Sequence, residues 1–287
     1  MGRVLVPTVL AVAGLCVGAP GAGSAPRHPK LQQVRSFAFA LGTGTLDGDV
    51  TARFAAFDLV VVDGEEARSS QVRALRARGK LVLAYLSVGT VEPGRFWYRQ
   101  AKAYRLRDRF EEFDEYYAAT SKRGYRRLIE RKVAPRILAK GFDGLFLDNT
   151  DMIADHPRQR QGMYRLVRAL ARLVHRRGKL LFSQNGDDVI GPSLRYYDGW
   201  NREDVTWTYD FDRRRYERVT DSDTRAAQAT MRRLARRGLL VTSSDYTRAG
   251  DKAAEAEAVH NSCTAGGLPF VTNIGITRIP TRPFVCR

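Results

Sequence analysis

The amino-acid sequence predicts an α/β protein whose strands and helices form a (β/α)8 TIM barrel. Three observations predict this class: eight short apolar runs, a glycine that ends the helical segment before five of them, and a span of about 250 residues after residue 35. The runs are nearly continuous rather than alternating, as in strands buried on both faces of a parallel sheet. They occupy residues 37–41, 57–63, 81–86, 142–148, 180–183, 196–200, 239–242 and 268–272.

The segments before five of these runs have the pattern of a helix that ends at glycine. Four of them carry basic residues in the last turn, which complement the negative end of the helix dipole, and the fifth lacks them. Apolar residues recur at three- and four-residue spacing through residues 161–177, the clearest amphipathic helix. The five helix ends lie at residues 76–79, 138–141, 175–178, 234–238 and 264–267.

Two intervals depart from a regular barrel. The starts of the fifth and sixth runs are 16 residues apart, and the 12 residues after Gly275 are few for a final helix. We therefore expect irregular structure around strands five and six and at the C-terminus. The glycines of residues 42–48 have the wrong last spacing for a dinucleotide-binding fingerprint, so this segment is predicted to be a loop.

The first 25 residues are predicted to be a signal peptide. Arg3 forms a short basic region, residues 4–17 are apolar, and residues 22–25 are small, as signal peptidase requires. The apolar run is too short for a transmembrane anchor, and the residues before Cys16 fit a lipoprotein cleavage site poorly. A buried N-terminal helix is the alternative. The sequence thus predicts a secreted, extracellular protein.

After the signal peptide, we expect a linker over residues 26–34 and a single barrel domain over residues 35–287. Cys263 and Cys286 are the cysteines that remain in this mature chain. In an oxidising compartment they are expected to form a disulfide that fixes the C-terminal tail, and two separately buried thiols are the alternative.

The composition is that of a basic globular protein. The chain has 44% hydrophobic and 28% charged residues, which excludes wholesale disorder. Lys and Arg number 48 against 31 Asp and Glu, for a net charge of +17. This excess predicts attraction to anionic surfaces and carries no information about the fold.

Polar and aromatic residues follow the predicted strands, where the active sites of such barrels lie. Carboxylates and amides suit the acid chemistry and hydroxyl recognition of a carbohydrate site, and we expect Tyr85, Trp97, Trp200, Trp207 and Tyr246 to supply flat rings for sugar faces. The candidate substrate-binding residues are Asp63, Tyr85, Ser87, Glu92, Arg95, Asn149, Asp151, Gln184, Asn185, Asp245 and Tyr246. Asp151 is equally suited to capping the helix that follows it.

The residues that several other classes of barrel enzyme need for catalysis are missing from this sequence. The four histidines form no metal-binding pair, and Lys80 and Lys179 lie at strand starts, away from the catalytic rim. The sequence has no Gly-x-Ser-x-Gly elbow and no spare catalytic thiol. We therefore expect no metal and no cofactor.

Asp148 and Glu203 are the candidate catalytic pair, because they follow strands four and six. Neighbouring strands lie about 4.8 Å apart, so the two carboxyl groups are expected at about 5–9 Å, a range that covers retaining and inverting glycosidases. The alternative roles for Asp148 are a helix cap and a salt-bridge partner. For Glu203, the register of strand six is not fixed by the sequence. Three aspartates at strand starts are expected to be structural: Asp58, Asp143 and Asp198.

Three segments carry a specific resemblance: residues 84–89 followed by Glu92 and Arg95, residues 141–151, and residues 183–186. Through them, residues 35 to 275 resemble glycoside hydrolase family 114, the endo-α-1,4-polygalactosaminidase-like TIM barrels. The resemblance implies hydrolysis of α-1,4 links in galactosamine or N-acetylgalactosamine polysaccharide. It also implies that Asp148 and Glu203 are the catalytic pair, and our working hypothesis makes Asp148 the nucleophile and Glu203 the acid/base.

The positive net charge conflicts with a cationic galactosamine polymer, because like charges repel. Either the cleft is locally acidic, or the substrate is neutral or fully acetylated. Two rival functions stay open: a non-catalytic carbohydrate-binding barrel, and a polyanion- or cell-envelope-binding protein. Arginines 123, 126, 127 and 131 and residues 213–215 suggest the second, although a solvated basic face explains them as well. We expect no specific nucleic-acid partner.

Overall fold

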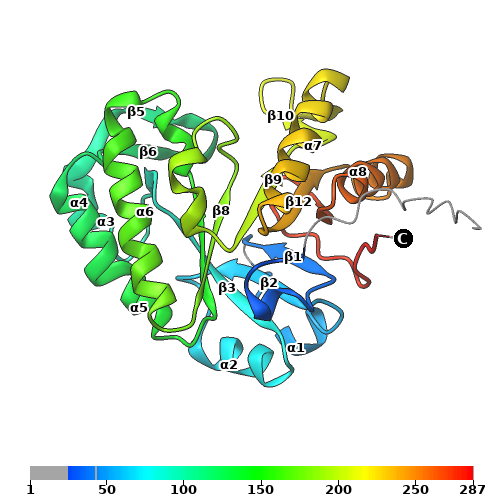
Figure 1. Cartoon of the computed structure of the whole chain (residues 1–287), viewed down its shortest axis with the longest axis horizontal. Helices are drawn as coiled ribbons and strands as arrows, with labels where there is room; N and C mark the ends of the chain where they lie inside the picture. Colours follow the sequence, from blue (N-terminus) through cyan, green and yellow to red (C-terminus); the bar gives the residue numbers. More distant parts are fainter. Residues whose placement is uncertain (1–24, 43, 287) are drawn as a thin grey trace, which may run out of the picture.

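The computed structural model describes residues 25–42 and 44–286 (Figure 1). The predicted signal peptide lies outside the described residues, except for Ala25. Within the described part, no helix is both long and apolar enough to cross a membrane. Residues 29–31 of the predicted linker form a short 3-10 helix whose Leu31 is fully buried, so this stretch packs against the barrel.

Eight parallel strands pair in chain order and form a nearly closed barrel (Figure 1). The predicted (β/α)8 fold is therefore confirmed. The strands are β1 (Phe37–Ala40), β2 (Leu59–Asp63), β3 (Leu81–Ser87), β7 (Gly144–Asp148), β8 (Leu180–Gln184), β9 (Gly199–Glu203), β12 (Leu240–Tyr246) and β13 (Leu268–Thr272). Among the described residues no backbone ladder joins β1 to β13. Instead, the rings of Phe37 and Phe270 meet edge to face, with centroids 6.0 Å apart.

Helices cover the outside of the barrel. The α-helices are α1 (Val50–Arg53), α2 (Ser69–Ala77), α3 (Tyr98–Ala101), α4 (Arg123–Leu128), α5 (Ala134–Leu138), α6 (Arg160–His175), α7 (Asp221–Arg236) and α8 (Lys252–Thr264). The shorter turns are η1 (Pro29–Leu31), η2 (Lys102–Tyr104), η3 (Glu111–Phe113), the π-helical η4 (Ile129–Val133), η5 (Thr150–Ile153), η6 (Pro157–Gln159) and η7 (Gly191–Tyr196).

The predicted helix ends are confirmed. Each of the five segments contains, at or next to its last residue, a glycine with φ between 60° and 105°, a conformation that other residues adopt only with strain. The apolar face predicted for residues 161–177 is the buried face of α6, where Leu166, Leu170 and Val174 are fully buried. Burial of this stripe attaches α6 to the barrel.

Both expected irregularities are present. The connection from β8 to β9 contains the 3-10 helix η7 in place of an α-helix, and the described chain continues beyond β13 without a further helix. A disulfide joins Cys263 of α8 to Cys286 in this tail, with their Cα atoms 5.2 Å apart. It is the pair that the sequence predicted.

The sixth strand lies three residues later than predicted, over Gly199–Glu203 rather than residues 196–200. The aromatic run that suggested a strand is taken up by the end of η7 and the turn after it. The true strand contains the fully buried Asn201, whose amide oxygen accepts a hydrogen bond from Thr242 Oγ1 at 2.8 Å. As a result, Glu203 is the last residue of the strand.

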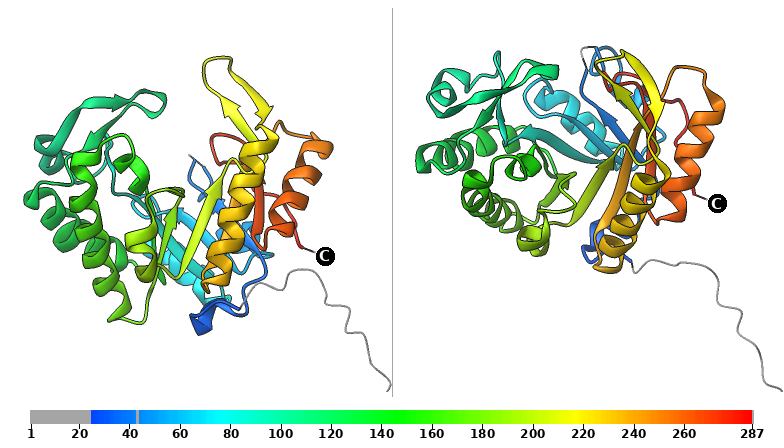
Figure 2. Two further views of the ribbon diagram at one scale, coloured as in Figure 1. Left: turned by 45° about the horizontal axis from the view of Figure 1, so that its top comes forward. Right: turned by 90° about the horizontal axis from the view of Figure 1, so that it is seen from above.

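Two insertions rise above the carboxyl ends of the strands. The first follows β3 and contains the three-stranded sheet β4 (Thr90–Val91), β5 (Arg105–Phe110) and β6 (Glu115–Ala118). The second follows β9 and is the hairpin of β10 (Trp207–Asp210) and β11 (Arg215–Arg218). Figure 2 shows the β5–β6 and β10–β11 hairpins on opposite sides of the barrel mouth. The apolar-run pattern predicted neither.

Candidate active site

Three consecutive strands of the barrel end in the same way. Asn149, Asn185 and Asp204 directly follow β7, β8 and β9, and their φ angles are 55°, 50° and 54°. This left-handed conformation is uncommon outside glycine, although Asn and Asp adopt it more readily than other residues. Such backbone outliers cluster at functional sites. The chain therefore turns sharply just after Asp148 and Glu203 and leaves both side chains at the rim.

Asp148 is held by two neighbours. The Tyr85 hydroxyl, on the adjacent strand β3, donates to Asp148 Oδ2 at 2.6 Å. The Asn149 backbone N–H donates to Oδ1 at 2.7 Å, and the Asn149 side-chain amide donates to Oδ2 at 3.3 Å. Burial raises the pKa of Asp148, whereas the hydrogen bonds from Tyr85 and Asn149 lower it. The carboxylate is thus fixed in one orientation.

Glu203 has its own set of donors. Gln184 Nε2 and Asn185 Nδ2, at the end of β8, donate to Glu203 Oε2 at 2.6 and 2.8 Å. The Tyr246 hydroxyl, at the end of β12, donates to Oε1. Asn185 Oδ1 also accepts the Glu203 backbone N–H at 3.0 Å. Two neighbouring strands therefore set the position of this side chain.

The protonation of Glu203 is strongly perturbed. Burial, together with the negative charges of Asp148 and Asp204, raises the pKa of Glu203 to about 8. A carboxyl group with such a pKa holds its proton near neutral pH, as a general acid requires. The repulsion also shows that Asp148 and Glu203 act on each other electrostatically across the barrel mouth.

A cavity of about 550 Å3 opens above the strand ends, and we call it the mouth cavity. Both candidate catalytic residues line it, and so do all the candidate substrate-binding residues except Ser87 and Asp245. The predicted residues that line it are Asp63, Tyr85, Glu92, Arg95, Asp148, Asn149, Asp151, Gln184, Asn185, Glu203 and Tyr246.

Ser87 and Asp245 are buried and do not line the mouth cavity. Asp245 is buried, and its Oδ1 accepts the backbone N–H groups of Thr206 and Trp207 at 2.6 and 2.8 Å. It thereby fixes the start of the second insertion. Ser87 Oγ accepts a hydrogen bond from Asn149 Nδ2 at 3.0 Å. Ser87 therefore supports Asn149, which lines the mouth cavity, whereas Asp245 supports the second insertion.

Arg95 lies among carboxylates. Its Nη1 donates to Asp63 Oδ2 at 2.7 Å, and its Nε donates to Glu92. Since both neighbours are acidic, the single positive charge of this corner is neutralised by the protein itself.

The three aspartates expected at strand starts are structural: Asp143 binds Arg76, and Asp58 and Asp198 accept backbone N–H groups.

Glu115 is a residue that the sequence did not single out. It begins β6 in the first insertion, lines the mouth cavity, and is 8% exposed. Its Oε2 has no hydrogen-bond partner among the described residues. Burial and the charges of Glu92 and Asp148 raise the pKa of Glu115 to about 7. A carboxyl group of this kind is available to a ligand.

The tryptophans expected to bind sugar faces do not line the mouth cavity. Trp97 and Trp200 are 2% and 0% exposed, so stacking on a ligand is excluded for both. Their indole N–H groups donate to Glu65 and to the Asn185 carbonyl. Trp207 donates to Glu257 at 3.0 Å, outside the cavity. This expectation was wrong for the tryptophans. Tyr85 and Tyr246 line the mouth cavity, where their hydroxyl groups donate to Asp148 and Glu203, and a stacking role for their rings stays a prediction.

Aromatic rings from the two insertions line the cavity instead. Phe113 of η3 meets Phe211, just after β10, edge to face with ring centroids 5.5 Å apart. Phe110 contacts Phe113 at 5.2 Å, and Tyr209 contacts Phe211 at 5.1 Å. We call these four rings the aromatic bridge. Because Phe113 and Phe211 are 48% and 38% exposed, they offer ring surface to a ligand as well as to each other.

Phe113→Ala is expected to raise KM for long oligosaccharides about 2–10-fold with little change in kcat, since it removes one stacking surface and leaves the carboxyl pair and its hydrogen bonds intact. Initial rates on oligomers of increasing length measure this. Phe96→Ala is the matched control, because Phe96 is 38% exposed and packs against Arg136 away from the cavity. An equal rise in KM in both variants would refute a binding role for the bridge.

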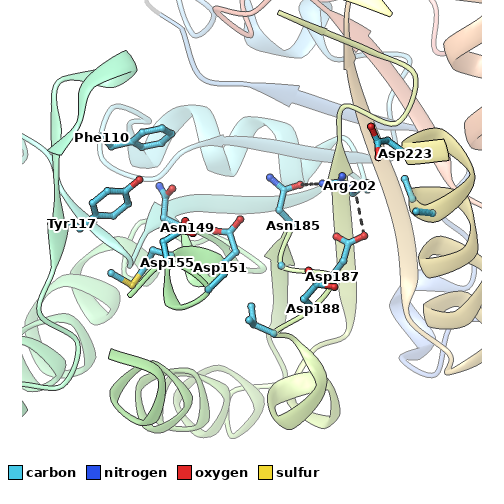
Figure 3. Close-up of a pocket in the computed structure, with 16 residues that line it drawn as sticks. Phe110, Tyr117, Asn149, Asp151, Asp155, Asn185, Asp187, Asp188, Arg202 and Asp223 are labelled. Atoms are coloured by element: carbon cyan, nitrogen blue, oxygen red, sulfur yellow. Dashed lines mark hydrogen bonds and ion pairs between the residues drawn. The ribbon is translucent and has the colours of Figure 1, made fainter. Parts of the chain in front are cut away.

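A second cavity of about 570 Å3 adjoins the first, and we call it the side cavity (Figure 3). The two share Phe110, Asn149, Asp151 and Asn185 in their lining. Five aspartates line the side cavity: Asp151, Asp155, Asp187, Asp188 and Asp223. Its basic residue, Arg202, lies 3.7 Å from Asp187. The combined cleft is therefore strongly acidic, although the whole chain carries a charge of +17.

Among the described residues, no group of three or more His, Cys, Asp or Glu side chains is arranged to hold a metal ion. Burial and the charge of Asp148 raise the pKa of Asp151 to about 7, and Asp151 lines both cavities. The side chains of this open polar cleft therefore provide carboxyl groups for proton transfer and for hydrogen bonds to a ligand.

Comparisons with solved structures agree with the barrel fold. The glycoside hydrolase domain of PelA from Pseudomonas aeruginosa is 21% identical with a TM-score of 0.72, over 85% of this chain and 96% of that one. Ega3 from Aspergillus fumigatus, solved with galactosamine, is 16% identical with a TM-score of 0.69, over 91% and 98%. An α-galactosidase from Thermus thermophilus is more distant, at 14% identity and a TM-score of 0.54, over 84% and 57%. At these identities the likeness concerns the fold.

The family itself is shown by sequence. No curated protein matches the chain. A family model, however, matches residues 19–275, most of its length, and its description is "Glycoside-hydrolase family GH114". This agrees with the resemblance of residues 84–89, 141–151 and 183–186 and with the barrel that the structure contains. The chain therefore belongs to glycoside hydrolase family GH114 and is a glycosidase.

Proposed function

We propose that this glycosidase cleaves α-1,4-linked galactosamine-type polysaccharide with Asp148 and Glu203 as its catalytic pair. The observation that carries the proposal is the acidic cleft around two half-buried, mutually repelling carboxyl groups at the mouth of a GH114 barrel. The solved complex of Ega3 with galactosamine supports this class of sugar.

The surroundings of the two carboxyl groups support different roles for them. Glu203, protonated near neutral pH, donates its proton to the glycosidic oxygen as the bond to the anomeric carbon breaks. Asp148, oriented by Tyr85 and Asn149, attacks the anomeric carbon and forms a glycosyl ester. Water, deprotonated by Glu203, then hydrolyses this ester, and the proton returns to Glu203.

The acidic cleft removes the conflict between a basic protein and a cationic polymer. A galactosamine unit carries an ammonium group, which is attracted by the carboxylates that line both cavities. The two bases of the cleft, Arg95 and Arg202, lie next to Asp63 and Asp187. The net charge of the whole chain is therefore a poor guide to the charge that the substrate meets.

Glu115→Gln is expected to lower kcat/KM for free-amine substrates about 10–100-fold, since one charge-assisted hydrogen bond to the ammonium is lost. Rates on N-acetylated substrates, which carry no ammonium, are expected to change far less. Glu112→Gln is the matched control, because Glu112 belongs to the same insertion, is exposed and lines neither cavity. Equal losses on both substrate types would contradict this role.

Reducing-end release from three matched oligomers tests the substrate class. We expect cleavage of α-1,4-galactosamine oligomers, slower cleavage of partly N-acetylated ones, and no cleavage of neutral α-1,4-galactose oligomers. Rapid cleavage of the neutral series would show that the acidic cleft does not select the substrate. Binding of the galactosamine series without any cleavage would favour a non-catalytic carbohydrate-binding barrel.

We also propose that the protein is secreted, with residues 1–25 as its signal peptide. The proposal rests on the sequence alone: a basic Arg3, an apolar stretch and a small-residue cleavage site. N-terminal sequencing of protein recovered from the medium tests it, and the expected first residue is Pro26. Recovery of protein that begins at Met1 inside the cells, with none in the medium, would refute it.

A further inference from the structure

A groove on the outside of the barrel is lined almost entirely by arginine. It lies between α6 and the helical stretch of α4 and η4, and has a volume of about 320 Å3 (α4 and α6 in Figure 1). Residues 123–131 contribute Arg123, Arg126, Arg127 and Arg131, and α6 contributes Arg165, Arg168 and Arg172. We call these seven residues the arginine groove. None of them lines the mouth cavity or the side cavity.

The positive charges of the arginine groove are not neutralised by the protein. Among the described residues, six of the guanidinium groups form neither an ion pair nor a hydrogen bond, and the seventh, Arg126, donates to the backbone carbonyls of Thr120 and Ser121. Glu130 is the acidic residue in the lining. Burial and the charges of Arg165 and Arg123 lower the pKa of Arg126. The repulsion between these crowded positive charges raises the free energy of the groove, and a bound anion relieves it.

The convergence of two segments distinguishes this groove from an ordinary basic helix face. Segments about 40 residues apart in sequence direct their arginines into one hollow, where a solvated face would spread them apart. By contrast, Arg218 on the second insertion is paired with Asp221 and Glu257. The arrangement therefore indicates a site for a negatively charged ligand.

The shape and lining define the ligand. Arg165, Arg168 and Arg172 lie along one face of α6 over about 10 Å, at a rise of about 1.5 Å per residue. A row of this length matches several charges along a chain better than one small ion. Planar guanidinium forks bind phosphate oxygens in pairs. No aromatic side chain lines the groove in the described structure, so it has no platform for bases or sugar rings.

We propose that the arginine groove binds a narrow polymer of polyol units joined by phosphodiesters. This binding attaches the enzyme to an anionic cell envelope. The acidic cleft and the arginine groove then act on opposite charges. The cleft draws in a cationic polysaccharide, while the groove holds the protein to an anionic surface. This inference does not depend on the sugar that the active site cleaves.

Binding of fluorescent poly(glycerol phosphate) to the full mature protein tests the proposal. Replacement of Arg127, Arg131 and Arg168 by Gln is expected to weaken binding about tenfold or more and to lower the slope of log affinity against log salt by about two to three. All three side chains are exposed, so the fold is expected to survive, and the single variant Arg168→Gln serves as a milder second test.

A matched control removes the same charge elsewhere. Arg73, Arg233 and Arg236 are exposed and lie outside the groove, so their replacement by Gln is expected to leave binding nearly unchanged. An equal loss in both triple variants would overturn the proposal, because it would show attraction by net charge alone. Tighter binding of single-stranded dT20 or of polygalacturonate would also overturn it. Hydrolysis of short galactosamine oligomers is expected to be unchanged by the groove substitutions, which separates this test from that of the active site.

Discussion

Glu203→Gln is expected to lower kcat on galactosamine oligomers by about a thousandfold, since the leaving sugar oxygen then receives no proton. Gln keeps the volume of the side chain and can still bond to Asn185 and Tyr246, so folding and substrate affinity are expected to change little. Binding by calorimetry and a thermal melt establish that the variant is intact. The loss of rate then reports on the acid catalyst itself.

A change of leaving group distinguishes the acid from the nucleophile. A dinitrophenyl glycoside of a short galactosamine oligomer departs without protonation, so Glu203→Gln is expected to form the glycosyl ester on it at nearly the wild-type rate. Asp148→Asn is expected to stay inactive on the same substrate, because the attacking carboxylate is missing. The reverse pattern would show that Glu203 is the nucleophile and Asp148 the acid. Full activity of both variants would refute the assignment of these residues as the catalytic pair.

The free enzyme is expected to be more stable at pH 5.5 than at pH 8.5. Burial raises the pKa values of five carboxyl groups: Glu115, Asp151 and Asp245 to about 7, Asp204 to about 6, and Glu203 to about 8. Unfolding returns them to ordinary values near 4, so between these limits the folded state binds more protons. The free energy of unfolding is then largest below pH 4–4.5 for these groups and is lost as the pH rises through 6–8.

Thermal melts at the two pH values measure this effect. Asp245→Asn is the informative variant, because an amide oxygen still accepts the N–H groups of Thr206 and Trp207 but does not ionise. Its melting temperature is expected to fall less between pH 5.5 and 8.5 than that of the wild type. Exposed carboxylates, lysines and arginines do not titrate in this interval. A melting temperature that rises with pH would contradict the burial of these carboxyl groups in neutral form.

The barrel was predictable because its strands and helix ends leave local signals. A strand covered on both faces is a continuous apolar run, and a helix that turns directly into such a strand needs a residue in the left-handed region, which glycine supplies at Gly79, Gly141 and Gly178. These signals do not depend on distant contacts. For the same reason, Asp148 was placed correctly at the end of an apolar run.

The sixth strand was misplaced because the barrel interior near the mouth is polar. Asn201 is fully buried yet hydrogen-bonded to Thr242, so the strand lacks an apolar run that would locate it. The two insertions were missed for a related reason. The strand Arg105–Phe110 is mostly charged and rests on the protein surface, where apolar periodicity is weak. Glu115 and the aromatic bridge belong to these insertions and were missed with them.

The exposure of aromatic residues also depends on contacts that the sequence does not reveal. The sequence pattern placed Trp97 and Trp200 near the ends of predicted strands, where sugar-stacking residues lie. Trp200 instead lies within β9, and the indole N–H groups of both residues donate to acceptors inside the protein. Phe113 and Phe211 gave no such signal, and their rings meet only because two insertions separated by about 100 residues fold over one mouth. Tertiary contact, rather than residue type, decides which rings face the substrate.

Hydrolysis of α-1,4-galactosamine oligomers by wild type and by Asp148→Asn, with binding measured on the same samples, tests the central claim most directly. We predict that the wild type releases new reducing ends, whereas the folded variant binds the oligomers with similar affinity and releases none above background. Cleavage by Asp148→Asn at the wild-type rate would contradict the assignment of Asp148 and Glu203 as the catalytic pair.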